Sequence, residues 1–193
     1  NTKDLKLMKK YADFAMYQVK NSTKGGIEDF DRKSYERDAF LMQSQEELNL
    51  LIDHRMVDYA FQPVVDARTG EVFGYEALMR PRTETIRTPL DVLRIARVHS
   101  KMGEIERLTW FECMKVYSQH PEWFGNRKIF INSISNQKLS PQDLQQFQKQ
   151  FSKNLSHIVI EMTEGDQMDM ECLREKQKSC RETGAAIALD DYG

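Results

Sequence analysis

Four strand-like runs of this sequence end in side chains that carry oxygen, and helical patterns lie between successive runs. The runs cover residues 71–76, 128–132, 157–161 and 185–191. Repeated strand–helix units build a parallel sheet whose strand ends meet on one face, where loops gather and ligands bind. We therefore expect the residues at the run ends to converge, although they are far apart in the sequence. These residues are Glu76, Asn132, Glu161, Asp190 and Asp191.

Carboxylate and amide oxygens are the ligands that hard divalent cations prefer in proteins. An acid on the inner side of a buried strand is costly unless it is paired or bound to a cation. Strand alternation places Glu76 and Arg80 on the same side, with Arg80 ~13 Å further along. Arg80 would there grip an anion lying over a metal, or pair with a carboxylate. The run ends thus predict a hard-cation site.

Five strands are expected after residue 57, near 59–65, 71–79, 128–133, 157–162 and 186–191. Helices are expected from Thr88-Pro89, over about 104–119, from Ser140-Pro141 to 151, and over about 170–182, since a capping residue followed by proline is a typical helix start. An eight-stranded (β/α)₈ barrel takes ~250 residues. Both an open, doubly wound sheet and a barrel cut after its fifth strand fit this count, and composition does not choose between them.

The first 57 residues show a different pattern. Residues 4–20 have apolar positions at helical spacing, and residues 27–35 are expected to hold one short edge strand. A second helix is expected over 34–57. Because it is polar on most faces, it fits a connector between domains. The domain boundary is therefore expected near residue 57.

The composition is that of a protein with a core, 40% hydrophobic and 30% charged, with a net charge of −2. This balance predicts no broad attraction to DNA or to anionic membranes. The three cysteines, Cys113, Cys172 and Cys180, are expected to be free thiols in a reducing cytosol. No apolar run reaches 18 residues, so no membrane span is expected and the predicted location is the cytoplasm.

Several segments together resemble the signature of one family. Residues 61–66 read Phe-Gln-Pro-Val-Val-Asp, and residues 75–80 read Tyr-Glu-Ala-Leu-Met-Arg. Residues 130–135 read Phe-Ile-Asn-Ser-Ile-Ser, residues 160–164 Ile-Glu-Met-Thr-Glu and residues 189–193 Leu-Asp-Asp-Tyr-Gly. They resemble EAL-domain proteins, the phosphodiesterases that hydrolyse cyclic di-GMP, with tyrosine for phenylalanine in the last segment. The resemblance covers about 46–193 and implies an incomplete TIM-like (β/α)₈ barrel with about five of its eight strands.

Residues 11–20 resemble the last helix of GGDEF domains, the diguanylate cyclase fold. No segment resembles the cyclase's own G-G-D-E-F loop, so cyclase activity is not expected of this chain. The resemblance implies a C-terminal GGDEF remnant over 1–35, a linker helix over 36–57 and the N-terminal portion of an EAL domain over 58–193. It also implies upstream GGDEF and sensory domains, with a possible inner-membrane anchor there.

The family resemblance implies roles for individual residues. Glu76, Asn132, Glu161 and Asp190 would ligate Mg²⁺ or Mn²⁺, and Asp191 would share a second ion. Arg80 would contact a phosphate of the dinucleotide, and Gln62 would be a further substrate contact. Glu164 would hold the loop after the fourth strand. The implied catalytic set is Asp190, Asp191 and Glu164.

The implied reaction is metal-dependent hydrolysis of cyclic di-GMP to linear pGpG, in which cations activate a water for attack on phosphorus. The family also has a lysine-bearing strand and an E-G-V-E segment, and neither has a counterpart in these 193 residues. The chain alone is therefore expected to be inactive, and a longer parent to be the enzyme. The alternative is a non-catalytic module that binds cyclic di-GMP or a protein. A homodimer through the EAL region is expected, and the unpaired edge of a fifth strand favours strand exchange.

Overall fold

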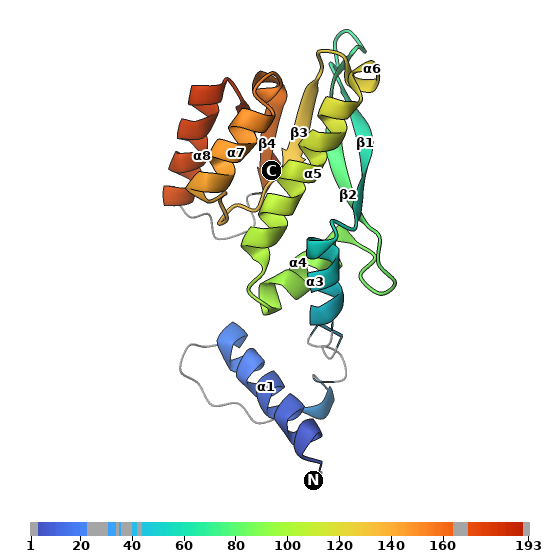
Figure 1. Cartoon of the computed structure of the whole chain (residues 1–193), viewed down its shortest axis with the longest axis vertical. Helices are drawn as coiled ribbons and strands as arrows, with labels where there is room; N and C mark the ends of the chain where they lie inside the picture. The colour runs from blue at the N-terminus through green and yellow to red at the C-terminus, as the bar shows by residue number, and fades with distance from the viewer. Residues whose placement is uncertain are drawn as a thin grey trace.

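The computed structural model describes residues 4–22, 31–33, 35, 40, 41, 44–163 and 170–190, and Figure 1 shows how their helices and strands are arranged. The strands are β1 (Val57–Val65), β2 (Val72–Pro81), β3 (Lys128–Asn132), β4 (Ile158–Thr163) and β5 (Ala186–Asp190). The α-helices are α1 (Leu5–Ser22), α3 (Gln45–Asp53), α4 (Pro89–Val98), α5 (Met102–Gln119), α6 (Pro121–Phe124), α7 (Pro141–Gln150) and α8 (Met170–Thr183). A 3₁₀ turn, η1 (Leu155–His157), precedes β4.

All five strands form one sheet in the order β1-β2-β3-β4-β5. The pair β1 and β2 is antiparallel, whereas β2, β3, β4 and β5 run parallel to their neighbours. The short 66–71 connection allows only an antiparallel hairpin, and helices connect the parallel strands. Strand order follows chain order, unlike a doubly wound sheet, whose order reverses at a switch point. The five predicted strands are confirmed, while closure into an eight-stranded barrel stays a prediction.

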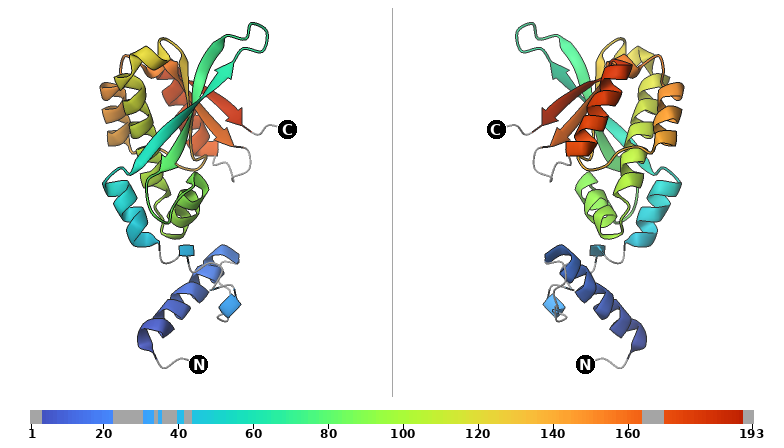
Figure 2. Two further views of the ribbon diagram at one scale, coloured as in Figure 1. Left: turned by 90° about the vertical axis from the view of Figure 1, so that its right-hand side faces the viewer. Right: turned by 90° about the vertical axis from the view of Figure 1, so that its left-hand side faces the viewer.

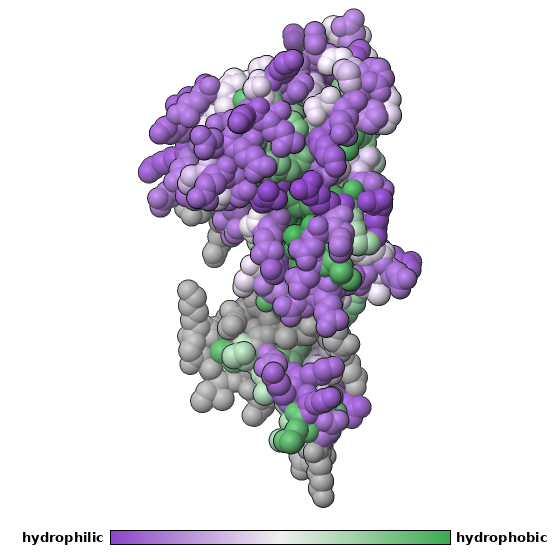
Figure 3. Space-filling view, viewed as in Figure 1, coloured by the Kyte–Doolittle hydropathy of each residue, from purple (hydrophilic) through white to green (hydrophobic). Residues whose placement is uncertain are grey.

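Helices α5, α7 and α8 cover one face of the sheet, as the turned views in Figure 2 show. Alternate strand residues point toward these helices; Ala77, Ile129, Ile131 and Ile160 are almost fully buried there. A second cluster of buried residues joins α3, α4 and the start of α5 to β1 and β2. The outer surface over α5, α7 and α8 is mainly hydrophilic (Figure 3). The apolar helix stripes therefore face the sheet, as amphipathic helices require.

The two predicted cap-and-proline helix starts are confirmed. The Thr88 hydroxyl accepts a hydrogen bond from the Asp91 backbone N–H, and the Ser140 hydroxyl accepts one from Asp143 N–H, each over 3.1 Å. Such capping satisfies an N–H group that has no partner within the helix. Helices α4 and α7 therefore begin where the sequence predicted.

The segment before the sheet differs from the prediction. Arg32, Lys33 and Tyr35 are helical, and Tyr35 N–H donates to the Asp31 carbonyl, so the edge strand expected over 27–35 is wrong in its described part. The helix expected over 34–57 is not continuous, because Ser44 lies in a turn and α3 ends at Asp53. A positive φ of 52° at Arg55 then turns the chain into β1.

Helix α3 is also more than a polar connector. Leu48 and Leu51 are fully buried, and they belong to the cluster that includes Met79 of β2 and Ile95 of α4. The burial of these two leucines was not predicted, because many charged residues surround them in the sequence. Within the part of the chain that the structure describes, no helix is long and apolar enough to cross a membrane.

Candidate metal and nucleotide site

The sheet face opposite α5, α7 and α8 carries the predicted metal ligands. Asn132 ends β3, and its side-chain Nδ2 donates a hydrogen bond to Glu76 Oε1 of β2 over 2.9 Å. Asn132 is also the register partner of Glu161 on β4. Residues in register on neighbouring strands present their side chains to the same face, about one strand spacing apart. The structure thus brings Glu76, Asn132 and Glu161 together, as predicted.

The surroundings of these three residues favour oxygen chemistry. Asn132 is exposed, and Glu76 and Glu161 are half-buried, with the Glu161 Oε2 atom shielded from solvent. The contact with Glu76 uses the amide nitrogen of Asn132 and leaves its oxygen for another interaction. Two carboxylates and an amide oxygen are donors of the kind that Mg²⁺ and Mn²⁺ accept. The described residues therefore fit part of a hard-cation site.

The remaining predicted ligands are only partly described. The backbone of Asp190 ends β5, where its register partner is Thr163 of β4. That places Asp190 one strand beyond Glu161, at the same end of the sheet. The Asp190 side chain, Asp191 and Glu164 lie outside the described residues, so their roles stay predictions. Among the described residues, no three carboxylate, histidine or cysteine side chains form a group that could hold a metal.

Gln62 and Arg80 lie on the β1–β2 hairpin beside this face. Gln62 is the register partner of Glu76, so the two side chains are neighbours across the antiparallel pair. Arg80 is exposed, four residues beyond Glu76, and its Nη1 donates to the Met79 carbonyl over 2.9 Å. Asp58, the register partner of Arg80, instead forms a 3.4 Å ion pair with Arg82. The structure thus gives Arg80 a backbone contact and leaves its guanidinium near the strand end.

A pocket of about 270 Å³ opens next to Asn132, between β2, the loop after β3, and the facing sides of α4 and α5. Leu78, Leu93 and Met102 give it apolar walls, while Asn132 and Ser135 add polar groups. Ligand pockets typically combine apolar walls with a few polar groups in this way. This pocket was not predicted, because its lining residues come from segments far apart in the chain.

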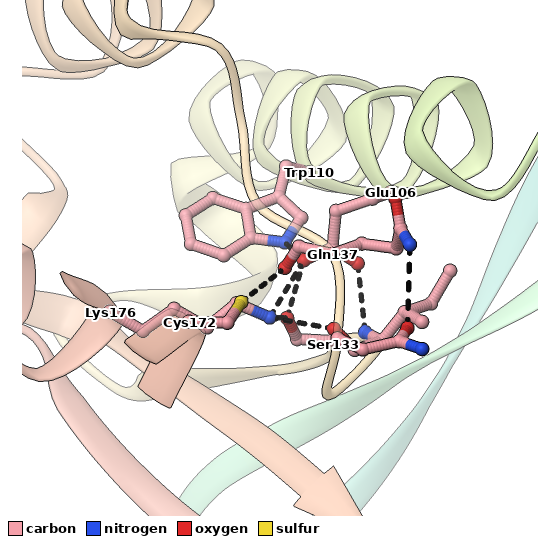
Figure 4. Close-up of polar contacts among 8 residues, drawn as sticks. Glu106, Trp110, Ser133, Gln137, Cys172 and Lys176 are labelled. Atoms are coloured by element: carbon pink, nitrogen blue, oxygen red, sulfur yellow. Dashed lines mark hydrogen bonds and ion pairs between the residues drawn. The ribbon is translucent and has the colours of Figure 1, made fainter. Parts of the chain in front are cut away.

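A buried ion pair, Glu106 of α5 with Lys176 of α8, was also not predicted; Figure 4 shows it with its polar contacts. A signal for Lys176 was present: Cys172, Lys176 and Cys180 recur every four residues, and all three are buried on one side of α8. A lysine in the middle of such a stripe indicates a buried partner. No sequence pattern identifies Glu106, which lies 70 positions away, as that partner.

Comparisons with known proteins identify the family of the chain and agree with its fold. A profile of the EAL domain family matches residues 45–193. The chain is 26% identical over 159 residues to "Probable cyclic di-GMP phosphodiesterase PdeB" of Escherichia coli (strain K12), a match that covers 74% of this chain and 28% of that protein.

Two solved structures show the same fold at low sequence identity. One is the FimX EAL domain of Xanthomonas citri in complex with c-diGMP, with a TM-score of 0.64, 16% identity, and coverage of 82% of this chain and 63% of that one. The other is Klebsiella pneumoniae BlrP1 in a manganese/cy-diGMP complex, with a TM-score of 0.57, 18% identity, and coverage of 84% and 46%. The chain thus spans 28% of the length of the curated relative and 63% of the FimX domain.

The family profile spans all five strands and far more than half of the chain, from α3 to Gly193. It includes Glu76 in the middle of β2, Asn132 at the end of β3 and Glu161 near the end of β4. This chain belongs to the EAL domain family.

Proposed function

We propose that this chain contributes the metal-binding and nucleotide-binding part of a cyclic di-GMP phosphodiesterase, which hydrolyses one phosphodiester bond to give linear pGpG. Family membership and the similarity to PdeB support this proposal. The observation that carries it is the contact between Glu76 and Asn132, with Glu161 in register beside Asn132. Three oxygen-bearing side chains on three neighbouring parallel strands thereby share one face of the sheet.

Each residue has a distinct role in the proposal. Glu76, Asn132 and Glu161 would hold Mg²⁺ or Mn²⁺, joined by Asp190, with Asp191 on a second ion. The cation, when bound, supplies Lewis-acid stabilisation of phosphate charge and lowers the pKa of a bound water.

The remaining residues would act on the substrate and on a neighbouring loop. Arg80 would hold a non-bridging phosphate oxygen, since a guanidinium binds phosphate through two parallel hydrogen bonds. Gln62, beside Glu76, would contact the dinucleotide, and Glu164 would order the segment after β4.

The pocket next to Asn132 offers a place for the part of the substrate that does not react. A purine base would lie against Leu78, Leu93 and Met102, and polar groups of the loop after β3 would reach its edge. The pocket is lined by Asn132 and by Ala77, which follows Glu76, so a base there would keep its phosphate near Glu76. Binding energy from the base would then position the scissile bond.

The test begins with binding by the 193-residue chain. Electron paramagnetic resonance titration should detect Mn²⁺ binding, and calorimetry should detect Mn²⁺-dependent binding of cyclic di-GMP. Glu76→Gln should weaken both, whereas Glu71→Gln, at the exposed position just before the same strand, should leave both unchanged. Wild-type chain that binds neither ligand would contradict the proposal.

Hydrolysis is then measured on a protein in which this chain is followed by the family's lysine-bearing strand and E-G-V-E segment. We expect conversion of cyclic di-GMP to pGpG with Mn²⁺, and no conversion by the 193-residue chain alone. A well-folded longer protein that binds the dinucleotide without cleaving it would instead establish a non-catalytic binding module.

We further propose that residues 1–35 are the C-terminal end of a GGDEF domain and that the EAL region forms a homodimer. The GGDEF proposal rests on the pattern of residues 11–20, and in the described region the Tyr11 and Tyr35 rings pack edge-to-face at 5.0 Å. Sedimentation of the 193-residue chain tests the dimer, and a monomer at all concentrations would contradict it.

A further inference from the structure

A buried salt bridge lies directly behind the candidate metal site. Glu106 and Lys176 expose 1% and 4% of their side chains, and Lys176 Nζ lies 3.2 Å from Glu106 Oε1. Burying two charges is costly unless further hydrogen bonds satisfy both groups. The hydrogen-bond partners of these two charged groups therefore indicate which part of the structure the pair holds in place.

Lys176 has one acceptor for each of its three N–H groups. Its Nζ donates to Glu106 Oε1, to Ser133 Oγ over 2.7 Å and to the Ile134 carbonyl over 2.8 Å. An ammonium group has three donors and no acceptor, so this set is complete. Two of the three acceptors belong to the loop that follows β3.

Glu106 is held by the same loop. Its Oε1 accepts hydrogen bonds from Ser133 Oγ over 2.5 Å and from Trp110 Nε1 over 3.1 Å, and its Oε2 accepts one from Ile134 N–H over 2.8 Å. Burial raises the pKa of Glu106, while Lys176 and these donors favour the ionised form. Figure 4 shows the network around Ser133.

Ser133 connects this network to the predicted metal ligands. It follows Asn132 directly, and its backbone N–H donates to the Glu161 carbonyl over 2.9 Å. Because side chains alternate along a strand, Asn132 faces the site while Ser133 faces the helices and meets the buried charges. The rest of the loop is also tied to α8, where Cys172 Sγ lies 3.3 Å from the Gln137 carbonyl.

We propose that Glu106 and Lys176 are positioning residues for the metal site, acting through Ser133 to fix the end of β3. With Ser133 held, Asn132 points at Glu76 and stays in register with Glu161. This inference rests on the proposed function, because it assigns the pair to the metal site of that function. Groups that orient metal ligands from behind typically change metal affinity by about 10–100-fold when removed.

If the pair has only a structural role in the core, a different result is expected. A buried ion pair that only fills the core can be exchanged for well-packed apolar residues with little effect on a site elsewhere. Positioning instead requires the hydroxyl and carbonyl contacts at Ser133 and Ile134. The test must therefore measure the environment of the Asn132 side chain as well as the stability of the protein.

The variant Ser133→Ala removes the hydroxyl that joins both charges and keeps the backbone N–H. Ser133→Thr restores a hydroxyl and serves as the rescue. Tyr117→Phe is the matched control, because it removes a hydroxyl that bonds the Arg127 carbonyl (2.7 Å) and His157 Nδ1 (2.9 Å) at the other end of β3. A fourth variant, Lys176→Met, removes the charge.

Two measurements are made on the 193-residue chain. The first is the side-chain amide signal of Asn132 in a ¹H–¹⁵N spectrum without metal, and the second is Mn²⁺ affinity by electron paramagnetic resonance. We expect Ser133→Ala and Lys176→Met to move or broaden the Asn132 signal and to weaken Mn²⁺ binding by about 10-fold or more. Ser133→Thr should restore both values, and Tyr117→Phe should change neither.

An unchanged Asn132 signal in folded Ser133→Ala would overturn the positioning role. If Lys176→Met fails to fold, Ser133→Ala alone decides, since it leaves both charges in place. Failure of the wild-type chain to bind Mn²⁺ would overturn the proposed metal site. It would not affect the test of the positioning role, because the Asn132 signal is measured without metal. The two proposals can therefore fail separately.

Discussion

Replacing Asn132 with aspartate would put a second carboxylate against Glu76. In the structure the Asn132 amide donates to Glu76 Oε1 over 2.9 Å, so Asn132→Asp exchanges a donor for a group of like charge. Two unit charges 4 Å apart repel by about 1 kcal/mol in water and about 4 kcal/mol at an effective dielectric constant of 20. Asn132 is exposed, which favours the lower figure. The lost hydrogen bond adds about 1 kcal/mol.

We therefore expect Asn132→Asp to lower the free energy of unfolding by about 2 kcal/mol at pH 7 without metal, from the repulsion and hydrogen-bond terms together. Urea unfolding in the presence of EDTA measures this. The repulsion should vanish at about pH 3, where most carboxyl groups are protonated. Added Mn²⁺ should restore stability, because a ligand that binds only the folded state stabilises it by mass action.

Asn136→Asp is the matched control for this experiment. It makes the same chemical change at an exposed position in the loop after β3, and we expect an effect within about 0.5 kcal/mol. Equal unfolding midpoints for Asn132→Asp and wild type in EDTA would refute the reasoning. They would mean that β2 and β3 do not bring Glu76 and Asn132 into contact in solution.

Three further predictions concern the sheet and the helices that support the site. Gly74→Ala should lower the free energy of unfolding, measured in urea, by about 1–3 kcal/mol, because an added Cβ would lie 2.7 Å from the Lys128 carbonyl oxygen. In the control, Gly103→Ala in α5, the added Cβ would meet only a side-chain tip at 3.3 Å. The control should leave the free energy of unfolding unchanged or raise it. Phe147→Ala should lower the free energy of unfolding by about 3–5 kcal/mol in the same assay, since Phe147 is only 1% exposed. A smaller loss would contradict the burial of this ring between α7 and the sheet. A hydrogen bond from Arg107 lowers the pKa of Asp143. This group therefore stabilises the fold above its unfolded pKa and loses that effect as the pH falls through its folded value. Asp143→Asn should lower the free energy of unfolding by up to about 1 kcal/mol at pH 7, and by progressively less as the pH falls below about 3.9, as measured by thermal unfolding over this pH range.

The strands and their polar ends were predictable because local signals agree there. Apolar runs of strand length end at Asn132 and Glu161, and the family motifs fall on the same positions. The starts of α4 and α7 were predictable for a similar reason, since a capping hydroxyl and a proline act within one turn. These features depend on neighbours in the sequence.

The features that the sequence did not reveal depend on distant contacts or on backbone geometry. The break at Ser44 and the positive φ at Arg55 leave no strong residue signal, because neither position is a glycine or a proline. The partner of Lys176 lies 70 residues away on another helix. The pocket beside Asn132 likewise forms only when β2, α4, α5 and the loop after β3 meet.

The two faces of β3 show why the proposed metal site and the core depend on each other. Ile129 and Ile131 are fully buried against the helices, while Asn132 lies on the opposite face. A slip of one residue would exchange the faces, exposing both isoleucines and burying the amide. Ser133 then adds a second restraint, since a slip would also remove its hydroxyl from Glu106 and Lys176. The orientation of Asn132 is therefore set twice, once by apolar packing and once by buried charge.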